Sequence, residues 1–203
     1  MALQTANIDV IYSQRSAPYF QPDINDISSK INQKTKAIVL VSPCNPTGSI
    51  ISNEIMNQIH QISKQNKIWI ILDKAYEHFE YSKHENDSKE RTESEIESEY
   101  ESYEGIISLY TMSKSYGMAG WRIGFLVHPK SLTNQLIKVH DLNLTHASVF
   151  SQKVASLALS DADSNEKYHS MNHTRLNTIR SEFSRGIQRF VNEFLPPNGG
   201  FYC

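Results

Sequence analysis

The sequence has few cysteines and no long apolar run, and its charges of opposite sign nearly cancel. Only Cys44 and Cys203 occur among 203 residues, too few for a disulfide framework, so we expect a protein of the reducing cytosol. No apolar stretch approaches the about 20 residues that span a membrane. A net charge of −2 offers no basic surface to nucleic acid or to an acidic membrane. The first residues also lack the basic and apolar regions of a secretory signal. These absences predict a cytoplasmic protein without nucleic-acid or membrane partners.

A metal site is not indicated either. The eight histidines show no spacing that is typical of metal ligands. The run from Asp161 to Asn165 resembles the start of a calcium loop, but its sixth position, where such loops require glycine, is Glu166. We therefore interpret this run as a helix cap.

Apolar periodicity predicts an α/β protein. Strands are expected at residues 8–12, 37–41, 68–72, 106–110 and 122–127, and helices at 24–33, 52–65, across most of the chain after Pro129, and in one long run at 164–194. The strand at 37–41 is apolar throughout, as expected if both of its faces are buried. Alternation of strand and helix predicts parallel pairing. The short connection to residues 122–127 predicts that this last strand is antiparallel.

Residues 84–104 differ in composition from the rest of the chain. They contain nine acidic residues and two basic ones, with little apolar material. Such a segment buries too little apolar surface to order itself, so we interpret it as a solvated, flexible insertion. An acidic docking surface is the alternative interpretation.

Three polar motifs each follow a predicted strand. They are Asn45-Pro46-Thr47-Gly48, Asp73-Lys74-Ala75-Tyr76, and the run Thr111-Met112-Ser113-Lys114-Ser115-Tyr116-Gly117-Met118-Ala119-Gly120-Trp121-Arg122-Ile123-Gly124. Ligands of open α/β sheets bind just outside the carboxyl ends of the strands. The motifs are therefore expected to meet at one ligand site.

The third motif has the chemistry to hold an aldehyde that also carries a phosphate. A lysine becomes a useful amine nucleophile when burial or nearby positive charge destabilises its ammonium form. Hydroxyls beside Lys114, and the guanidinium of Arg122, are phosphate donors. Taken singly, each residue has an ordinary interpretation: Lys114 as a solvated lysine, Arg122 as a surface ion pair, Asp73 as a helix cap, and Asn45 to Gly48 as a turn.

In this order the motifs resemble the pyridoxal-phosphate-dependent aminotransferases of fold type I, in the aspartate aminotransferase-like class I/II group. The resemblance implies a three-layer α/β domain with a mainly parallel sheet and helices on both faces, here partial, at residues 1–163. A long connecting helix and the start of a small α+β domain would follow at 164–203. It also implies pyridoxal 5′-phosphate as cofactor, an amino acid of aspartate, alanine or aromatic type and a 2-oxo acid as substrates, and a homodimer.

The resemblance also implies a role for each motif residue. Lys114 would form the Schiff base with the cofactor and carry the proton that moves at the substrate α-carbon. Asp73 would keep the pyridine nitrogen protonated, so that the ring accepts electrons. Tyr76 and Asn45 would hydrogen-bond the phenolic oxygen of the ring. Hydroxyl and guanidinium groups would bind the phosphate, namely those of Thr111, Ser113 and Arg122.

The resemblance extends from about Ile8 to Tyr202, which corresponds to the middle of a complete aminotransferase. The upstream phosphate-binding turn and the downstream arginine that binds the substrate carboxylate fall outside it. Two alternatives therefore remain. The chain is a truncated aminotransferase-like protein that only binds cofactor or is inactive, or it is a pyridoxal-phosphate-dependent lyase of the same fold.

Overall fold

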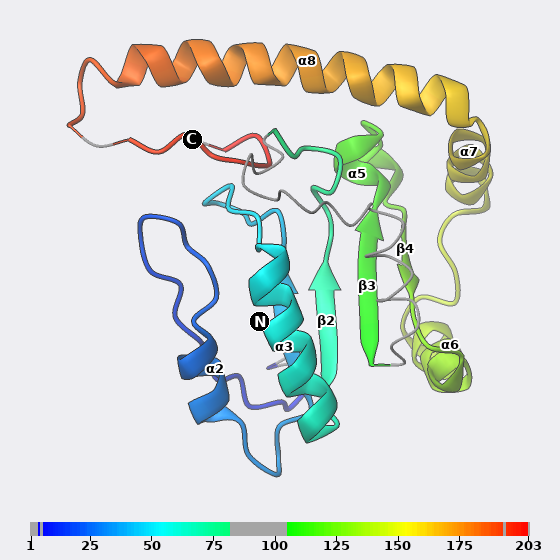
Figure 1. The fold of residues 1–203 in the computed structure, drawn as a ribbon. Coiled ribbons are helices and arrows are strands. Elements are labelled where there is room, and N and C mark those ends of the chain that lie inside the picture. The colour runs from blue at the N-terminus through cyan, green and yellow to red at the C-terminus, as the bar shows by residue number, and fades with distance from the viewer. Residues whose placement is uncertain (1–3, 5, 82–104, 193, 203) are drawn as a thin grey trace.

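The computed structural model describes residues 4, 6–81, 105–192 and 194–202, so the acidic segment 84–104 lies outside the described residues. Four strands form one sheet in the order β1 (Ala37–Val41), β2 (Trp69–Asp73), β3 (Ile106–Thr111) and β4 (Gly124–Val127) (Figure 1). The first three strands are parallel, and β4 is antiparallel to β3. Both predicted strand directions are confirmed.

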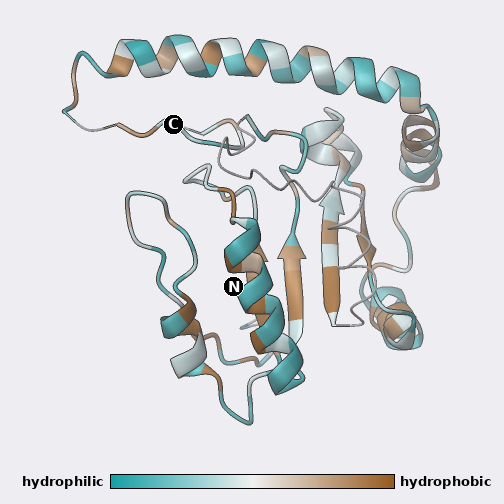
Figure 2. Ribbon diagram, viewed as in Figure 1, coloured by the Kyte–Doolittle hydropathy of each residue, from teal (hydrophilic) through white to brown (hydrophobic). Residues whose placement is uncertain are grey.

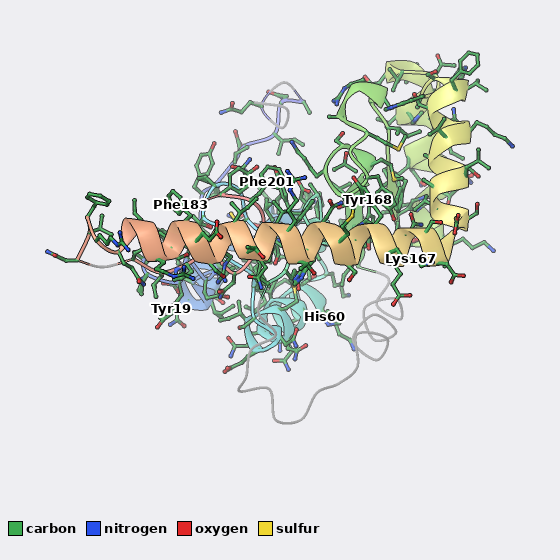
Figure 3. The ribbon with its side chains drawn as sticks, turned by 90° about the horizontal axis from the view of Figure 1, so that it is seen from above. Tyr19, His60, Lys167, Tyr168, Phe183 and Phe201 are labelled. Carbon is green, nitrogen blue, oxygen red and sulfur yellow. The ribbon has the colours of Figure 1, made fainter. Side chains whose placement is uncertain are left out.

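Helices lie on both sides of this sheet and across its top. They are α2 (Ile24–Lys30), α3 (Asn53–Asn66), α5 (Met112–Ser115), α6 (Thr133–Asn143), α7 (Val149–Ser160) and α8 (Ala162–Ile187), with 3₁₀ turns η1 (Ala119–Trp121) and η2 (Lys130–Leu132). Seen from above, α3 lies on one side of the sheet and α7 on the other (Figure 3). The long helix α8 passes over the carboxyl ends of the strands (Figures 1 and 3). The chain therefore has the predicted α/β architecture.

The main core lies between α3 and the strands β1 and β2. Ser52 caps α3 by accepting a hydrogen bond from the amide of Ile55, which starts the helix at the predicted place. The apolar stripe of α3 then packs Ile59 against Leu40 and Ile70, and these three side chains are buried. Figure 2 shows the same division, because the strands are apolar and the outer face of α3 is hydrophilic. Each such side chain contributes about 1.5–3 kcal/mol through burial.

A second, smaller core holds the polypeptide that follows β3. Met112 and Met118 pack with Ala155 of α7, and all three are buried. The hydroxyl of Ser151, also in α7, donates a 2.8 Å hydrogen bond to the carbonyl of Trp121. Helix α7 thus fixes the segment between Lys114 and β4.

Two of the predicted elements are wrong or too long at the ends of the chain. Residues 8–12 form no strand: within the described residues this region has only an isolated bridge from Arg15 to Pro22, and Ile8 and Ile11 are exposed. The pattern was apolar, but no neighbouring strand pairs with it. The long helix ends at Ile187 rather than at residue 194, because Gln188 caps it by donating to the carbonyls of Ser184 and Gly186.

Smaller differences concern single residues. Helix α2 is capped by Asp23 as predicted but stops at Lys30, because Ile31 is already extended. Strand β4 begins at Gly124, since Arg122 has a left-handed backbone with φ of 50°. Burial of β1 on both faces is also wrong, because Val39 is half exposed while Leu40, on the α3 side, is buried.

Candidate active site

The register of the sheet places the three motifs at one edge. Asp73, the last residue of β2, pairs with Val41 of β1 and with Leu109 of β3. The segment from Asn45 follows β1, and Lys114 follows β3 in α5. Because neighbouring strands are about 4.8 Å apart, these segments begin side by side. The structure therefore brings the motifs together at the carboxyl ends of the parallel strands.

Asp73 is held in place by the turn that follows it. Its Oδ1 accepts a 2.9 Å hydrogen bond from the amide of Ala75. Its backbone continues the ladder, since the amide of Lys74 donates to the carbonyl of Leu109 at 2.9 Å. The second carboxylate oxygen of Asp73 has no partner among the described residues, although the side chain is only partly exposed. This carboxylate is oriented and has one oxygen left for a cationic partner.

The amine of Lys114 faces the rings of Tyr76 and Phe201, which are named here the aromatic wall. Thr111 caps the short helix α5 by accepting a hydrogen bond of 3.1 Å from the amide of Ser113. One residue further along, the Nζ atom of Lys114 lies 5.9 Å from the ring centroids of Tyr76 and Phe201. Tyr76 is itself buried. The structure thus places the amine of Lys114 over the ring of Tyr76.

Arg122 reaches the site with its backbone but not with its guanidinium. The ladder pairs Thr111 with Gly124, and Met112 donates to the carbonyl of Ile123 at 3.2 Å, so the backbone just after Arg122 is held to the start of α5. Its Nη1, however, donates to the carbonyl of Ala119 at 2.9 Å, and the side chain is exposed. A positive φ at a residue other than glycine is unfavourable and recurs at functional sites.

Asn45 is the predicted site residue with the fewest contacts. Its side chain is exposed in the segment after β1, and it forms no hydrogen bond with Tyr76 in the described residues. Its loop is nevertheless closely packed, because the amide of Gly48 donates to the carbonyl of Cys44 at 2.7 Å. The structure places Asn45 at the same edge as Asp73 without bringing their side chains into contact.

Two aromatic residues near the end of the chain complete the wall, and sequence reasoning missed them. The hydroxyl of Tyr202 forms a hydrogen bond with the hydroxyl of Tyr76. The ring of Phe201 packs edge-on against Tyr76, with centroids 5.3 Å apart. Burial, and then the hydrogen bond to Tyr76, raise the pKa of Tyr202 to about 12. The only signal in the sequence is the pair Gly199-Gly200 before two aromatic residues.

Helix α8 is fastened over this edge. The Nε2 atom of His173 lies 2.7 Å from the carbonyl oxygen of Glu80, and the guanidinium of Arg180 donates to the carbonyl of Pro197. Figure 3 shows α8 crossing the molecule above Phe201. The helix therefore connects the loop after Tyr76 with the segment that carries Phe201.

Neither a metal-binding cluster nor a membrane-spanning helix is present in the described part of the chain. Residues 4, 6–81, 105–192 and 194–202 contain no group of three His, Cys, Asp or Glu side chains that would hold a metal ion. None of their helices combines the length and the apolar character that crossing a membrane requires. Asp161 caps α8 by accepting a 3.0 Å hydrogen bond from the amide of Ser164, as its interpretation as a helix cap predicted.

Comparison with known proteins identifies the family. All of the chain, residues 1–203, matches the family model described as aminotransferase class I and II. The chain belongs to this family. The predicted family is thereby confirmed, and so is the predicted cofactor at the level of the family, because class I/II aminotransferases depend on pyridoxal phosphate.

Individual relatives lie within the same group of aminotransferases. The chain is 30% identical over 190 residues to an aspartate aminotransferase of Pyrococcus abyssi, covering 90% of this chain and 45% of the relative. It is 28% identical over 190 residues to aromatic-amino-acid aminotransferase 2 of Thermococcus litoralis, which again covers 90% of this chain and 45% of the relative. The chain thus spans about half the length of the curated relatives it matches.

Solved structures confirm the fold of this aminotransferase-family chain. A double mutant of Thermus thermophilus aspartate aminotransferase superposes with a TM-score of 0.85 at 21% identity, covering 98% of this chain and 50% of that structure. At this identity the likeness establishes the fold alone. The sheet and helices described above are therefore those of a fold type I aminotransferase.

The residues at the candidate site fit pyridoxal phosphate. The cofactor presents an aldehyde, a basic ring nitrogen, a phenolic oxygen and a phosphate. The site offers an amine at Lys114, a carboxylate oxygen without a partner at Asp73, and a hydroxyl at Tyr76. Hydroxyls at the start of α5 and the nearby backbone of Arg122 lie at the same edge. Each group of the cofactor has a chemically matching residue.

Proposed function

We propose that this chain carries the cofactor-binding part of an aminotransferase that moves an amino group between an amino acid, of aspartate, alanine or aromatic type, and a 2-oxo acid. The observation that supports this proposal most directly is the position of the Lys114 amine, 5.9 Å from the ring centroid of Tyr76 at the edge where Asp73 ends β2. When bound, pyridoxal phosphate withdraws electrons from the bonds at the substrate α-carbon.

Asp73 and Lys114 supply the proton chemistry in this proposal. The oxygen of Asp73 that Ala75 does not contact would hold a proton on the ring nitrogen, since a partly buried carboxylate gains most from such a cationic partner. Lys114 binds the cofactor through its amine. The same amine would later move a proton at the substrate α-carbon, since its Nζ atom faces the rings of Tyr76 and Phe201 at the edge of the sheet.

The remaining site residues orient the cofactor. Tyr76 donates its hydroxyl proton to the phenolic oxygen, and Asn45 adds an amide donor from the neighbouring loop. The hydroxyls of Thr111 and Ser113 bind the phosphate. The guanidinium of Arg122 would exchange its hydrogen bond with the carbonyl of Ala119 for the phosphate, which its planar set of donors suits.

We also propose that the protein acts in the cytoplasm as a homodimer. Exposed apolar side chains at the end of α6, on the connection that follows and at the start of α7 support a second copy as the occupant of that surface. Their exposed fractions exceed one half: Leu142 86%, Leu144 65%, Val149 66% and Phe150 81%. A patch of this kind marks an interaction site. Analytical ultracentrifugation of the wild type and of Phe150→Asp tests this, and we expect a dimer and a monomer respectively.

The test of the function begins with cofactor attachment. The chain is incubated with pyridoxal phosphate, reduced with borohydride, digested and mapped by mass spectrometry. We expect the label on the peptide that contains Lys114, and its loss in Lys114→Ala. Lys153→Ala, which changes an exposed lysine of α7, is the matched control and retains the label. Absence of label on the wild-type peptide contradicts the proposal.

Turnover separates an enzyme from a cofactor binder. Wild-type chain loaded with cofactor is incubated with aspartate, alanine or phenylalanine and 2-oxoglutarate, and glutamate formation is followed. We expect glutamate with at least one amino donor and none with Lys114→Ala. Labelling of Lys114 without any glutamate would assign the chain as a cofactor-binding protein. In a parallel incubation with serine and no 2-oxo acid, loss of water from the β-carbon followed by hydrolysis to pyruvate and ammonia would assign the chain as a lyase.

A further inference from the structure

Residues 197–202, named here the C-terminal segment, run across the carboxyl edge of the sheet beneath α8 (Figure 1). Three backbone hydrogen bonds of 2.8 Å hold the segment to two of the motif loops: Gly199 to the Gly48 carbonyl, Gly200 to the Phe79 carbonyl, and Tyr81 to the Asn198 carbonyl. The hydroxyl of Tyr81 donates a further hydrogen bond, of 2.6 Å, to the carbonyl of Gly200. The segment is therefore part of the site and not a loose end.

Glycines set how closely the segment approaches. A Cβ atom on Gly48 would lie 2.4 Å from the Cβ atom of Pro197, and Gly48 also has φ of +63°. A Cβ atom on Gly199 would lie 2.7 Å from the Cβ atom of Pro43. Neither contact tolerates a side chain. The path of the segment is thus fixed against the loop that carries Asn45.

This path directs the hydroxyl of Tyr202 at one partner. Rings of Tyr202 and Tyr76 meet edge-on with centroids 5.4 Å apart, and their hydroxyls are hydrogen-bonded. Each hydroxyl carries one proton. When Tyr202 donates to Tyr76, Tyr76 retains its own proton for a third atom. Tyr76 also faces Lys114, whose Nζ lies 5.9 Å from its ring centroid.

We propose that Tyr202 is a positioning residue for Tyr76: its hydroxyl donates to the Tyr76 hydroxyl and directs the Tyr76 proton to the phenolic oxygen of the cofactor. This inference rests on the proposed function. A hydroxyl that accepts one hydrogen bond becomes a stronger donor in the next, so Tyr202 also strengthens the bond that Tyr76 makes. A tyrosine hydroxyl is protonated at neutral pH, as a donor must be, and burial raises the pKa of Tyr202 further.

The first experiment tests the hydroxyl pair without cofactor. Unfolding equilibria are measured for the wild type, Tyr76→Phe, Tyr202→Phe and the double variant. A neutral hydrogen bond predicts that the two substitutions are coupled by roughly 2- to 10-fold in the unfolding equilibrium constant. Tyr19→Phe, at an exposed tyrosine far from the site (Figure 3), is the matched control and shows no coupling with Tyr76→Phe. Strict additivity of the Tyr76 and Tyr202 effects overturns the proposal.

The second experiment tests positioning through cofactor spectra. The visible absorbance of the loaded chain is titrated with pH. A donor to the phenolic oxygen stabilises its deprotonated form, so Tyr76→Phe raises the apparent pKa. Tyr202→Phe is expected to raise it in the same direction by less, and to weaken cofactor binding roughly 2- to 10-fold. In the Tyr76→Phe background, Tyr202→Phe is expected to add nothing.

Several results would contradict the positioning role of Tyr202. An unchanged titration in Tyr202→Phe, or a full additional shift in the Tyr76→Phe background, overturns the positioning role while leaving the proposed function standing. Tighter cofactor binding by Tyr202→Phe also overturns it, since Tyr202 then competes with the cofactor for Tyr76. A wild type that takes up no cofactor removes both the proposed function and this inference.

Discussion

The imidazole rings of His78 and His169 stack face to face, with centroids 4.0 Å apart and planes 10° from parallel. His78 lies two residues after Tyr76, and His169 belongs to α8, so the stack joins the motif loop to the helix above it. Tyr116 packs edge-on against both rings. The Nε2 atom of His169 is buried and has no hydrogen-bond partner among the residues that the structure describes. This contact suits two neutral rings and opposes their protonation.

The stack predicts a loss of stability in mild acid. Burial, followed by the charges of His169 and Lys74, lowers the pKa of His78 to about 4, and burial also lowers the pKa of His169. Glu77, with Oε1 3.5 Å from the Nε2 atom of His78, is the opposing charge. Unfolded histidine has a pKa of about 6.5, so below that pH the unfolded chain binds more protons.

The free energy of unfolding is therefore expected to fall as pH drops from about 6.5 towards 4. Urea unfolding at several pH values measures this slope. His78→Phe removes one titrating ring and is expected to flatten the slope, whereas His140→Phe, an exposed histidine of α6, is expected to leave it unchanged. An equal slope in wild type and His78→Phe would contradict the prediction.

Replacing Gly48 with alanine is expected to strain the backbone and destabilise its contact with residues 197–200. In Gly48→Ala the new methyl group meets Pro197 and the carbonyl of Gly199, and the left-handed conformation adds about 1–2 kcal/mol of strain. We expect a lower free energy of unfolding and faster hydrogen exchange at the amides of Gly199 and Gly200. Gly186→Ala is the matched control, because its added Cβ meets nothing within 4 Å and alanine favours a helix by about 0.5–1 kcal/mol. Equal effects of the two substitutions would be inconsistent with this packing.

Replacing Asp73 is expected to weaken cofactor binding while leaving the fold intact. Asp73→Asn keeps an oxygen that accepts from Ala75 but removes the charge that pairs with a protonated ring nitrogen. Loss of a charged hydrogen bond is expected to weaken pyridoxal phosphate binding roughly 10- to 100-fold. Fluorescence titration with the cofactor measures affinity, and circular dichroism checks the fold. Asp163→Asn, on exposed α8, serves as control; unaltered affinity in Asp73→Asn would rule out the assigned role.

A cavity in the core between α3 and the sheet is expected to lower the free energy of unfolding. Ile59 is fully buried between α3 and the sheet, so Ile59→Ala is expected to lower the free energy of unfolding by about 2–5 kcal/mol. Ile137→Ala, with a side chain 60% exposed on α6, is expected to change it by less than about 0.5 kcal/mol. Urea denaturation of both variants gives the comparison. Similar losses would show that Ile59 is not part of a close-packed core.

Local signals predicted most of the fold. The strand Ala37–Val41 lies where its apolar run placed it, and the caps Asp23 and Ser52 start their helices as their side chains indicated. The order of the motifs also led to the correct family. Residues 8–12 misled because an apolar run becomes a strand only when a neighbour pairs with it. The end of α8 was misplaced because apolar spacing continues beyond the residue where backbone caps stop the helix.

The sequence predicted less of the candidate site than of the fold. Lys114, Asp73 and Tyr76 follow strand ends, so their common edge followed from strand order alone. The contact of Tyr76 with Tyr202 joins positions 126 residues apart, and no local pattern reports such a pair. The stack of His78 on His169 has the same long-range origin. The roles assigned to all of the site residues stay predictions, and the side chains of Asn45 and Arg122 are exposed, that of Arg122 bonded to Ala119.

The return of the C-terminal segment to the motif loops has a consequence for biosynthesis. A nascent polypeptide emerging from the ribosome can form the sheet and its first core from local pairings well before residues 197–202 are translated. Until then the amine of Lys114 lacks the Phe201 side of its surroundings. The two-sided aromatic contact of the Lys114 amine therefore forms only once residue 201 has left the ribosome, whereas the sheet beneath it can form earlier.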